Sequence, residues 1–111
     1  MTITETLIDK RYVKISLEGE LDAASSIQVD EVIQKWLQEG TTFFHIDCSN
    51  LTYISSAGLG VFMSYVEEIN QNGGKMIFSD MSPKVFNVFE LLGLNQVMTI
   101  VGTVQEAEKY L

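Results

Sequence analysis

Residues 43–60 read FFHIDCSNLTYISSAGLG, and this stretch decides the fold. Its first six residues are almost continuously apolar and aromatic, which is typical of a central strand covered on both faces of a sheet. Residues 49–54 then predict a loop, and Ser55 and Ser56 precede a helix. The helix is indicated by apolar residues at helical spacing, which are Leu59, Phe62, Met63, Val66 and Ile69. A strand, a loop and a helix in this order indicate an α/β protein with helices on both sides of its sheet.

The residues before this stretch predict an edge hairpin and a first helix. Residues 2–8 are rich in β-branched types and residues 13–18 alternate between apolar and polar side chains, so we expect two half-buried strands. The first helix begins with Ser25 or Ser26 as its cap and ends at Gly40. Its apolar stripe consists of Val29, Val32, Ile33, Trp36 and Leu37.

The residues after the stretch predict two more strands and two more helices. Residues 76–79 indicate a short buried strand. The pair Ser82-Pro83 combines a capping hydroxyl with a proline at the first helical position, and Gly93 marks the end of that helix. Residues 96–101 supply a last strand, and Thr103 begins a capping-box pattern that opens a C-terminal helix.

Together these elements predict a single α/β domain over residues 1–111. We expect a mixed sheet of about four to five strands, with a parallel core and an N-terminal edge hairpin, flanked by about four helices. Binding sites of parallel sheets tend to lie outside the carboxyl ends of the strands. Ser55 and Ser56 follow a predicted strand and occupy that position.

The charge balance excludes several classes of partner. The chain has 111 residues, with 7 Lys+Arg against 15 Asp+Glu and a formal net charge of −8. Because phosphate backbones and anionic lipids repel such a chain, we expect no nucleic-acid or membrane partner. The single cysteine, Cys48, cannot close an internal disulfide. With no charged-then-apolar leader and no apolar run near the roughly 18 residues of a membrane span, we expect a cytoplasmic protein.

Catalytic and metal sites fit the sequence poorly. A hydrolase elbow at Ser56 requires Gly two positions earlier, where the chain has Ile54, and the only base, His45, lies within a predicted strand. Gly58 and Gly60 lack the further glycine or lysine of nucleotide-binding loops, so they indicate close packing of the helix start on the sheet. One His and one Cys cannot supply the four ligands of a structural zinc site. We expect no catalytic residue, metal or cofactor.

Two interpretations of Ser55 and Ser56 remain open. Either serine can cap the second helix by accepting a hydrogen bond from a free backbone N–H group. The same helix start carries a partial positive charge of about half a unit and unpaired donors, so it also tolerates a phosphate on a hydroxyl. That phosphate would add a charge of about −1.5 to −2 to the surface.

Three stretches of the chain occur in a familiar order. They are Gly19-Glu20-Leu21-Asp22, then residues 47–60, then Ser82-Pro83 ahead of an apolar helix that ends at Leu91-Leu92-Gly93-Leu94. In this arrangement the chain resembles the STAS domain of bacterial anti-sigma factor antagonists. The resemblance spans nearly the whole chain, and residues 51–60 are its most specific part.

The resemblance implies a partner-switching protein rather than an enzyme. In that family the unmodified antagonist binds an anti-sigma factor that is also a serine kinase, which frees the sigma factor. Phosphorylation of a serine at the start of the second helix breaks the complex, and a PP2C-type phosphatase resets it. Carried onto this chain, the phosphoacceptor is Ser56, two residues before Gly58.

Further residues follow from the same resemblance. Ser55 stands where many antagonists have Asp, so it is either a decoy that is not modified or a second acceptor. The resemblance places the partner-binding surface at Asp22, Ser55, Ala57, Gly58 and Leu59. Asp22 is equally well interpreted as a turn residue bonded to nearby backbone. We expect a monomer when the protein is free. The alternative function is a STAS scaffold of a transporter or signalling complex that is never phosphorylated.

Overall fold

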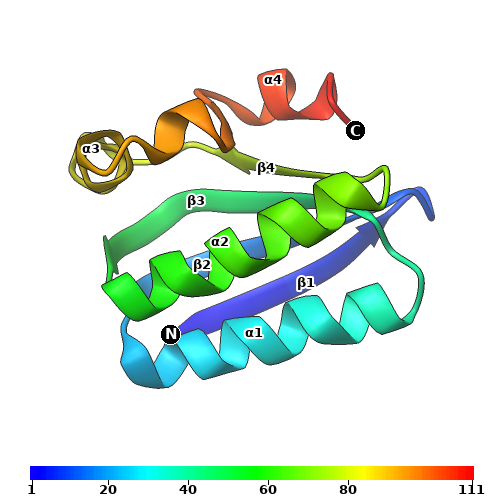
Figure 1. The fold of residues 1–111 in the computed structure, drawn as a ribbon, viewed down its shortest axis with the longest axis horizontal. Coiled ribbons are helices and arrows are strands. Elements are labelled where there is room, and N and C mark those ends of the chain that lie inside the picture. Colours follow the sequence, from blue (N-terminus) through cyan, green and yellow to red (C-terminus); the bar gives the residue numbers. More distant parts are fainter.

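A five-stranded sheet forms the centre of the molecule, and its strand order is β1-β2-β3-β4-β5 (Figure 1). The structure is a computed structural model that describes residues 1–111. The strands are β1 (Thr2–Ile8), β2 (Tyr12–Leu21), β3 (Phe43–Ile54), β4 (Lys75–Ser79) and β5 (Thr99–Val101). β1 and β2 pair antiparallel, and all other neighbours pair in parallel. The predicted α/β fold, with an edge hairpin and a parallel core, is confirmed.

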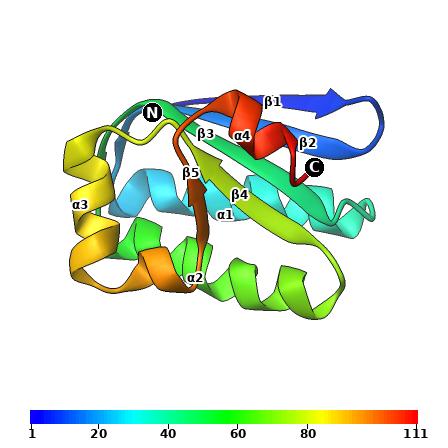
Figure 2. The ribbon, with the colours of Figure 1, turned by 90° about the horizontal axis from the view of Figure 1, so that it is seen from above.

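The helices are distributed unevenly over the two faces of the sheet. They are α1 (Ala23–Gln38), α2 (Ser56–Gln71), α3 (Pro83–Leu91) and α4 (Val104–Glu108), with a short 3₁₀ turn η1 (Leu94–Gln96) after α3. Figure 2 shows α1 and α2 on one face, α4 on the other, and α3 at one end of the sheet. Each parallel strand is added on the same side of the previous one, so right-handed crossovers place α1 and α2 together. None of these helices is long and apolar enough to cross a membrane.

The face opposite α1 and α2 is polar and only partly covered. Lys14 and Ser16 of β2 are half-buried there, and both interact with Asp47 of β3. The Ser16 hydroxyl donates to the Asp47 carboxylate at 3.2 Å, and the Lys14 ammonium lies 4.0 Å from it. The central strand expected over residues 43–48 is buried or half-buried throughout, with His45 buried on this face, and exposure begins at Ser49.

Residues 49–54 form the second half of β3, so the prediction of a loop was wrong. Pairing with β2 continues as far as Leu21 opposite Ile54, with two register shifts along the way. Leu51 and Ile54 are buried while the polar residues between them are exposed. The irregular register hides the simple alternation by which a strand is normally recognised.

The prediction that Ser25 or Ser26 caps the first helix was wrong, because α1 begins earlier. Asp22 is the N-cap: its Oδ1 accepts from the Ser25 N–H at 2.9 Å. The Ser25 hydroxyl in turn accepts from the Asp22 N–H at 2.9 Å, which completes a capping box. The Ser25 N–H, reinforced by the Ser25 hydroxyl, lowers the pKa of Asp22 below its ordinary value. The cap therefore favours the ionised carboxylate.

The later elements agree more closely with the sequence prediction. Ser82 caps α3 by accepting from the Val85 N–H at 3.2 Å, and Pro83 is the first helical residue, as predicted. The last strand is shorter than residues 96–101, because Gln96 ends η1 and Val97 and Met98 form a turn before Thr99–Val101.

A cluster of three phenylalanines joins α2, β4 and α3. Phe62 and Phe78 meet edge to face with ring centroids 5.0 Å apart, and Phe78 lies 6.0 Å from Phe89. All three are fully buried, and such aromatic pairs add specific geometry to the hydrophobic core. Met63 was expected in the same apolar stripe but is 50% exposed.

Gly58 and Gly60 differ in function, although the sequence suggested close packing for both. A Cβ at Gly58 would lie 2.7 Å from Leu21 Cγ and 3.1 Å from Ile54 Cγ1. Both of those side chains are buried, so Gly58 permits the start of α2 to lie directly on the ends of β2 and β3. Nothing lies within 4 Å of a Cβ at Gly60, so the expectation was wrong there.

We expect opposite stability changes from Gly58→Ala and Gly60→Ala. Overpacking against Leu21 should lower the free energy of unfolding by about 1–3 kcal/mol in Gly58→Ala. Gly60→Ala should raise it by up to about 1 kcal/mol, because alanine favours a helix interior. Urea unfolding monitored by circular dichroism measures both, and equal stabilities of the two variants would contradict the packing described for Gly58.

We expect the cap at Asp22 to make the free energy of unfolding depend on pH in the acidic range. Because the pKa is lowered on folding, the contribution is present at neutral pH and is lost as pH falls below the ordinary carboxyl value of 3.8. Asp22→Asn retains a capping acceptor without this titration, whereas Asp22→Ala lacks both. Urea midpoints should show Asp22→Ala as the least stable at neutral pH. The difference between wild type and Asp22→Asn should shrink on acidification, and a pH-independent difference would argue against the ionised cap.

Candidate functional site

The starts of α1 and α2 lie side by side at the carboxyl ends of β2 and β3 (Figure 1). The Ser55 N–H donates to the Leu21 carbonyl at 2.8 Å, which fastens the start of α2 to the end of β2. Asp22, the cap of α1, directly follows Leu21. Two residues that the sequence analysis singled out separately, Asp22 and Ser55, are therefore neighbours in space.

Ser55 is the N-cap of α2. Its hydroxyl accepts from the Gly58 N–H at 3.2 Å, and its backbone carbonyl accepts from the Leu59 N–H at 3.0 Å. The side chain is half-buried. Of the two serines that the sequence allowed as caps, Ser55 has this structural role, and its hydroxyl is already bonded.

Ser56 is the first helical residue of α2 and is exposed. Its hydroxyl makes no hydrogen bond within the chain, and the N–H groups of Ser56 and Ala57 have no acceptor there. A free hydroxyl beside two free donors at a positively polarised helix start is chemically suited to carry an anionic group.

The remaining predicted contact residues divide into exposed and buried ones. Asp22 and Ala57 are exposed, so a partner can reach them. Gly58 is buried and Leu59 is 4% exposed, so both lie beneath the surface of the free chain and support the turn.

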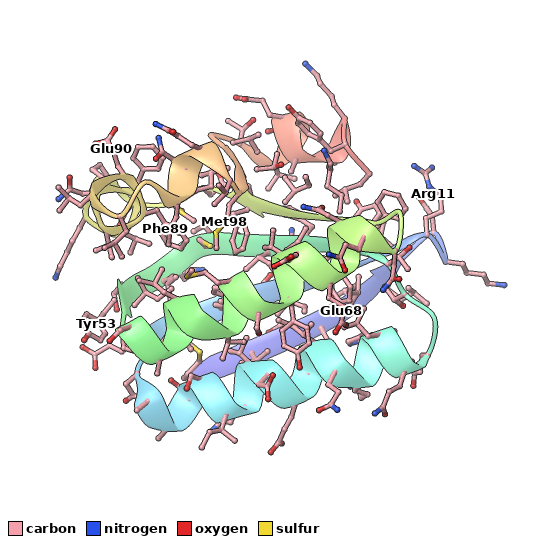
Figure 3. All side chains as sticks on the ribbon, in the orientation of Figure 1. Arg11, Tyr53, Glu68, Phe89, Glu90 and Met98 are labelled. Carbon is pink, nitrogen blue, oxygen red and sulfur yellow. The ribbon has the colours of Figure 1, made fainter.

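Three exposed residues near the helix starts were not predicted as site residues. Tyr53 is 44% exposed, pairs across the sheet with exposed Glu20, and is labelled at the Ser56 end of the molecule in Figure 3. Ile27 of α1 is 61% exposed. Ile27 could have been found in the sequence, because it lies outside the apolar stripe of its helix. Tyr53 could not, because its strand was interpreted as a loop.

His45 and Cys48 lie in the core of the sheet, away from the helix starts. His45 Nε2 is 2.6 Å from the Ser79 hydroxyl, and both residues are buried. Burial lowers the pKa of His45, with a further contribution from Lys14, so the imidazole is held neutral. Burial raises the pKa of the Cys48 thiol, as expected for a core residue. No group of three or more potential metal ligands is present.

Comparison with known proteins identifies relatives over most of the chain. The chain is 29% identical over 96 residues to an anti-sigma-B factor antagonist of Staphylococcus epidermidis, covering 86% of this chain and 89% of the relative. It is 28% identical over 96 residues, with the same coverage, to an anti-sigma-B factor antagonist of Staphylococcus aureus.

Solved structures share the fold. A putative anti-sigma factor antagonist from Thermotoga maritima superposes with a TM-score of 0.90 at 23% identity, covering 96% of this chain and 92% of that one. The Bacillus cell fate determinant SpoIIAA in its phosphorylated form superposes with a TM-score of 0.76 at 26% identity, covering 97% of each chain. The family model described as the STAS domain matches residues 4–107. The chain therefore belongs to the STAS domain family.

Proposed function

We propose that this chain is an anti-sigma factor antagonist that binds a serine-kinase anti-sigma factor and is released by phosphorylation at Ser56. The observation that carries the proposal is the difference between the two neighbouring serines. The Ser56 hydroxyl is exposed and unbonded, whereas the Ser55 hydroxyl is half-buried and caps α2. A kinase can therefore reach Ser56 without breaking a bond of the fold.

The relatives support this role. The Staphylococcus proteins are named anti-sigma-B factor antagonists. The phosphorylated form of SpoIIAA has the same fold, which supports the expectation that a STAS domain accepts a phosphate without unfolding. In this proposal the kinase supplies the ATP, a PP2C-type phosphatase removes the phosphate, and the chain itself acts in the cytoplasm by binding and not by catalysis.

Local geometry explains why the phosphate would be tolerated. The free N–H groups of Ser56 and Ala57 can donate to phosphate oxygens, and the partial positive charge of the helix start stabilises the anion. The core beneath, which Gly58 and Leu59 close, does not need to move. The modification therefore changes the outer surface and leaves the fold intact.

The same phosphate would disfavour an acidic partner surface. Two unit charges at a separation of about 6 Å repel by roughly 3 kcal/mol at an effective dielectric constant of 20, which corresponds to about a hundredfold in affinity before screening. Asp22 already contributes one negative charge next to the start of α2. We expect the partner to contact Asp22, Ala57 and Tyr53, with Ser55 at the edge of the surface.

We expect the phosphate on Ser56 when the chain is incubated with ATP and each serine-kinase anti-sigma factor of the same genome. Mass spectrometry of the peptide containing both serines should locate the modification. Ser56→Ala should abolish it, whereas Ser55→Ala should keep it and lose about 1 kcal/mol of stability through the missing cap.

Two results would count against this assignment. Phosphate on the Ser56→Ala protein would assign the site to Ser55. Absence of modification by every such kinase would favour the scaffold function, in which Ser56 is only part of the helix start.

We expect Ser56→Ala and Ser56→Asp to separate binding from release. Ser56→Ala should bind the cognate kinase at least as tightly as wild type, and should do so constitutively. Ser56→Asp adds a charge at the interface and should weaken binding by about tenfold or more. Isothermal titration calorimetry measures both affinities, and equal values for the two variants would reject the switch. Ser64→Asp, on an exposed position of the same helix, controls for charge alone.

A further inference from the structure

A shallow groove runs between α2 and the segment that follows α3. Its volume is about 510 Å³. One wall is formed by Met63 and Val66 of α2, and the other by Val97 and Met98. Figure 3 labels Met98 between α2 and the α3 region. The groove thus lies on the helix-bearing face, towards the β5 edge.

Both walls of the groove carry exposed apolar side chains. Met63 is 50% exposed and Val97 is 66% exposed, while Met98 forms a buried floor. Leu91 and Leu92, at the end of α3, are 76% and 61% exposed and lead into the same segment. Exposed apolar patches of this kind on a small domain often mark an interaction surface.

The lining of the groove carries negative charge only. Glu67 is the one charged residue in its walls. α2 contains two glutamates and no Lys or Arg, and residues 91–101 contain no charged residue. The nearest cation in sequence, Lys75, lies with its ammonium 5.4 Å from the Tyr110 ring centroid on the α4 side of the sheet. A partner with positive charge therefore complements the groove, and a second copy of this chain, at −8, does not.

The shape of the α2 wall suits a helix. Met63, Val66, Glu67 and Asn70 follow one another at spacings of three and four residues, which forms a ridge that another helix can pack against. The ridge continues to Gln71 and is about 12 Å long, or roughly two helical turns. Asn70 and Gln71 are exposed at its end and can hydrogen-bond polar side chains of a partner.

We propose that this groove binds a cationic amphipathic helix of a partner protein, with its apolar face against Val97 and Met63 and a Lys or Arg near Glu67. The proposal goes beyond the switch at Ser56, because Met63 lies about 10 Å along α2 from that residue. At that separation ordinary salt screens most of the interaction with a phosphate. The groove therefore remains available in both states of Ser56.

The five methionines of the chain provide the probe. The full chain with ¹³C-labelled methionine methyl groups is titrated with a 14-residue amphipathic Leu/Lys peptide and, separately, with the same peptide carrying Glu in place of Lys. The Leu/Lys peptide should shift the Met63 and Met98 signals in a saturable way. The signals of Met76, buried in the core, and of Met81, in a different hollow of the surface, should stay unchanged.

Matched variants distinguish specific binding in the groove from nonspecific attraction of a cationic peptide to an acidic protein. Val97→Ser should weaken binding of the Leu/Lys peptide about tenfold, because burial of the exposed two thirds of a valine side chain contributes about that factor. Ile27→Ser, at a similarly exposed position of α1, should leave the affinity unchanged. Glu67→Gln should weaken binding about threefold, and Ser56→Asp should change it by less than about threefold, because salt screens a charge at that distance.

Several results would overturn the inference. Equal binding of the Leu/Glu peptide, equal effects of Val97→Ser and Ile27→Ser, or non-saturable shifts at all methionines would each do so. Shifts of Met63 and Met98 that depend on protein concentration alone would assign the groove to a second copy of the chain. Loss of peptide binding in Ser56→Asp would contradict the independence from the switch while leaving the proposed switch itself intact.

Discussion

The attachment of α2 to the end of β2 determines the geometry of the candidate site. It consists of the Ser55 N–H bond to the Leu21 carbonyl and of the close contact that the absent side chain of Gly58 permits above Leu21. Together they bring the starts of two helices to one end of the sheet and leave Ser56 exposed there. The position of Ser56 is therefore set by contacts with the core.

The order and type of the elements could be predicted from the sequence, and several boundaries could not. The spacing of apolar residues identifies the helices, because one face of each helix must be buried. The pair Ser82-Pro83 identifies the start of α3, because a helix cap depends on residues next to each other in sequence. Residues 49–54 mix polar and apolar types and pair with β2 through a shifted register. This pairing depends on tertiary contacts and leaves no simple alternation in the local sequence. The same holds for the cap at Asp22, since Ser25 is an equally good capping type and only the path of the chain decides between them.

At the site, the sequence offered two adjacent serines as candidates for the proposed phosphoacceptor, and the family resemblance selected Ser56. Hydrogen bonding distinguishes them physically, because only one side chain can bend back to the Gly58 N–H. Helical spacing places Leu59 in the apolar stripe of its helix and leaves Ala57 outside it, and the first is buried and the second exposed. Tyr53 and the groove beside Met98 depend on the packing of distant segments, which explains why no motif indicated them.

The order of the strands also bears on how the chain reaches its native state. Every strand pairs with its neighbour in sequence, so each pairing closes only the segment between two consecutive strands. The parallel pairs still join residues about thirty positions apart, such as Val13 and Phe44, and this non-local pairing forms more slowly than the hairpin or a helix. During synthesis the hairpin, α1 and β3 can assemble before the later residues have left the ribosome, with α2 added onto a sheet that is already formed. The turn that displays Ser56 would thus be completed early, before the C-terminal elements are in place.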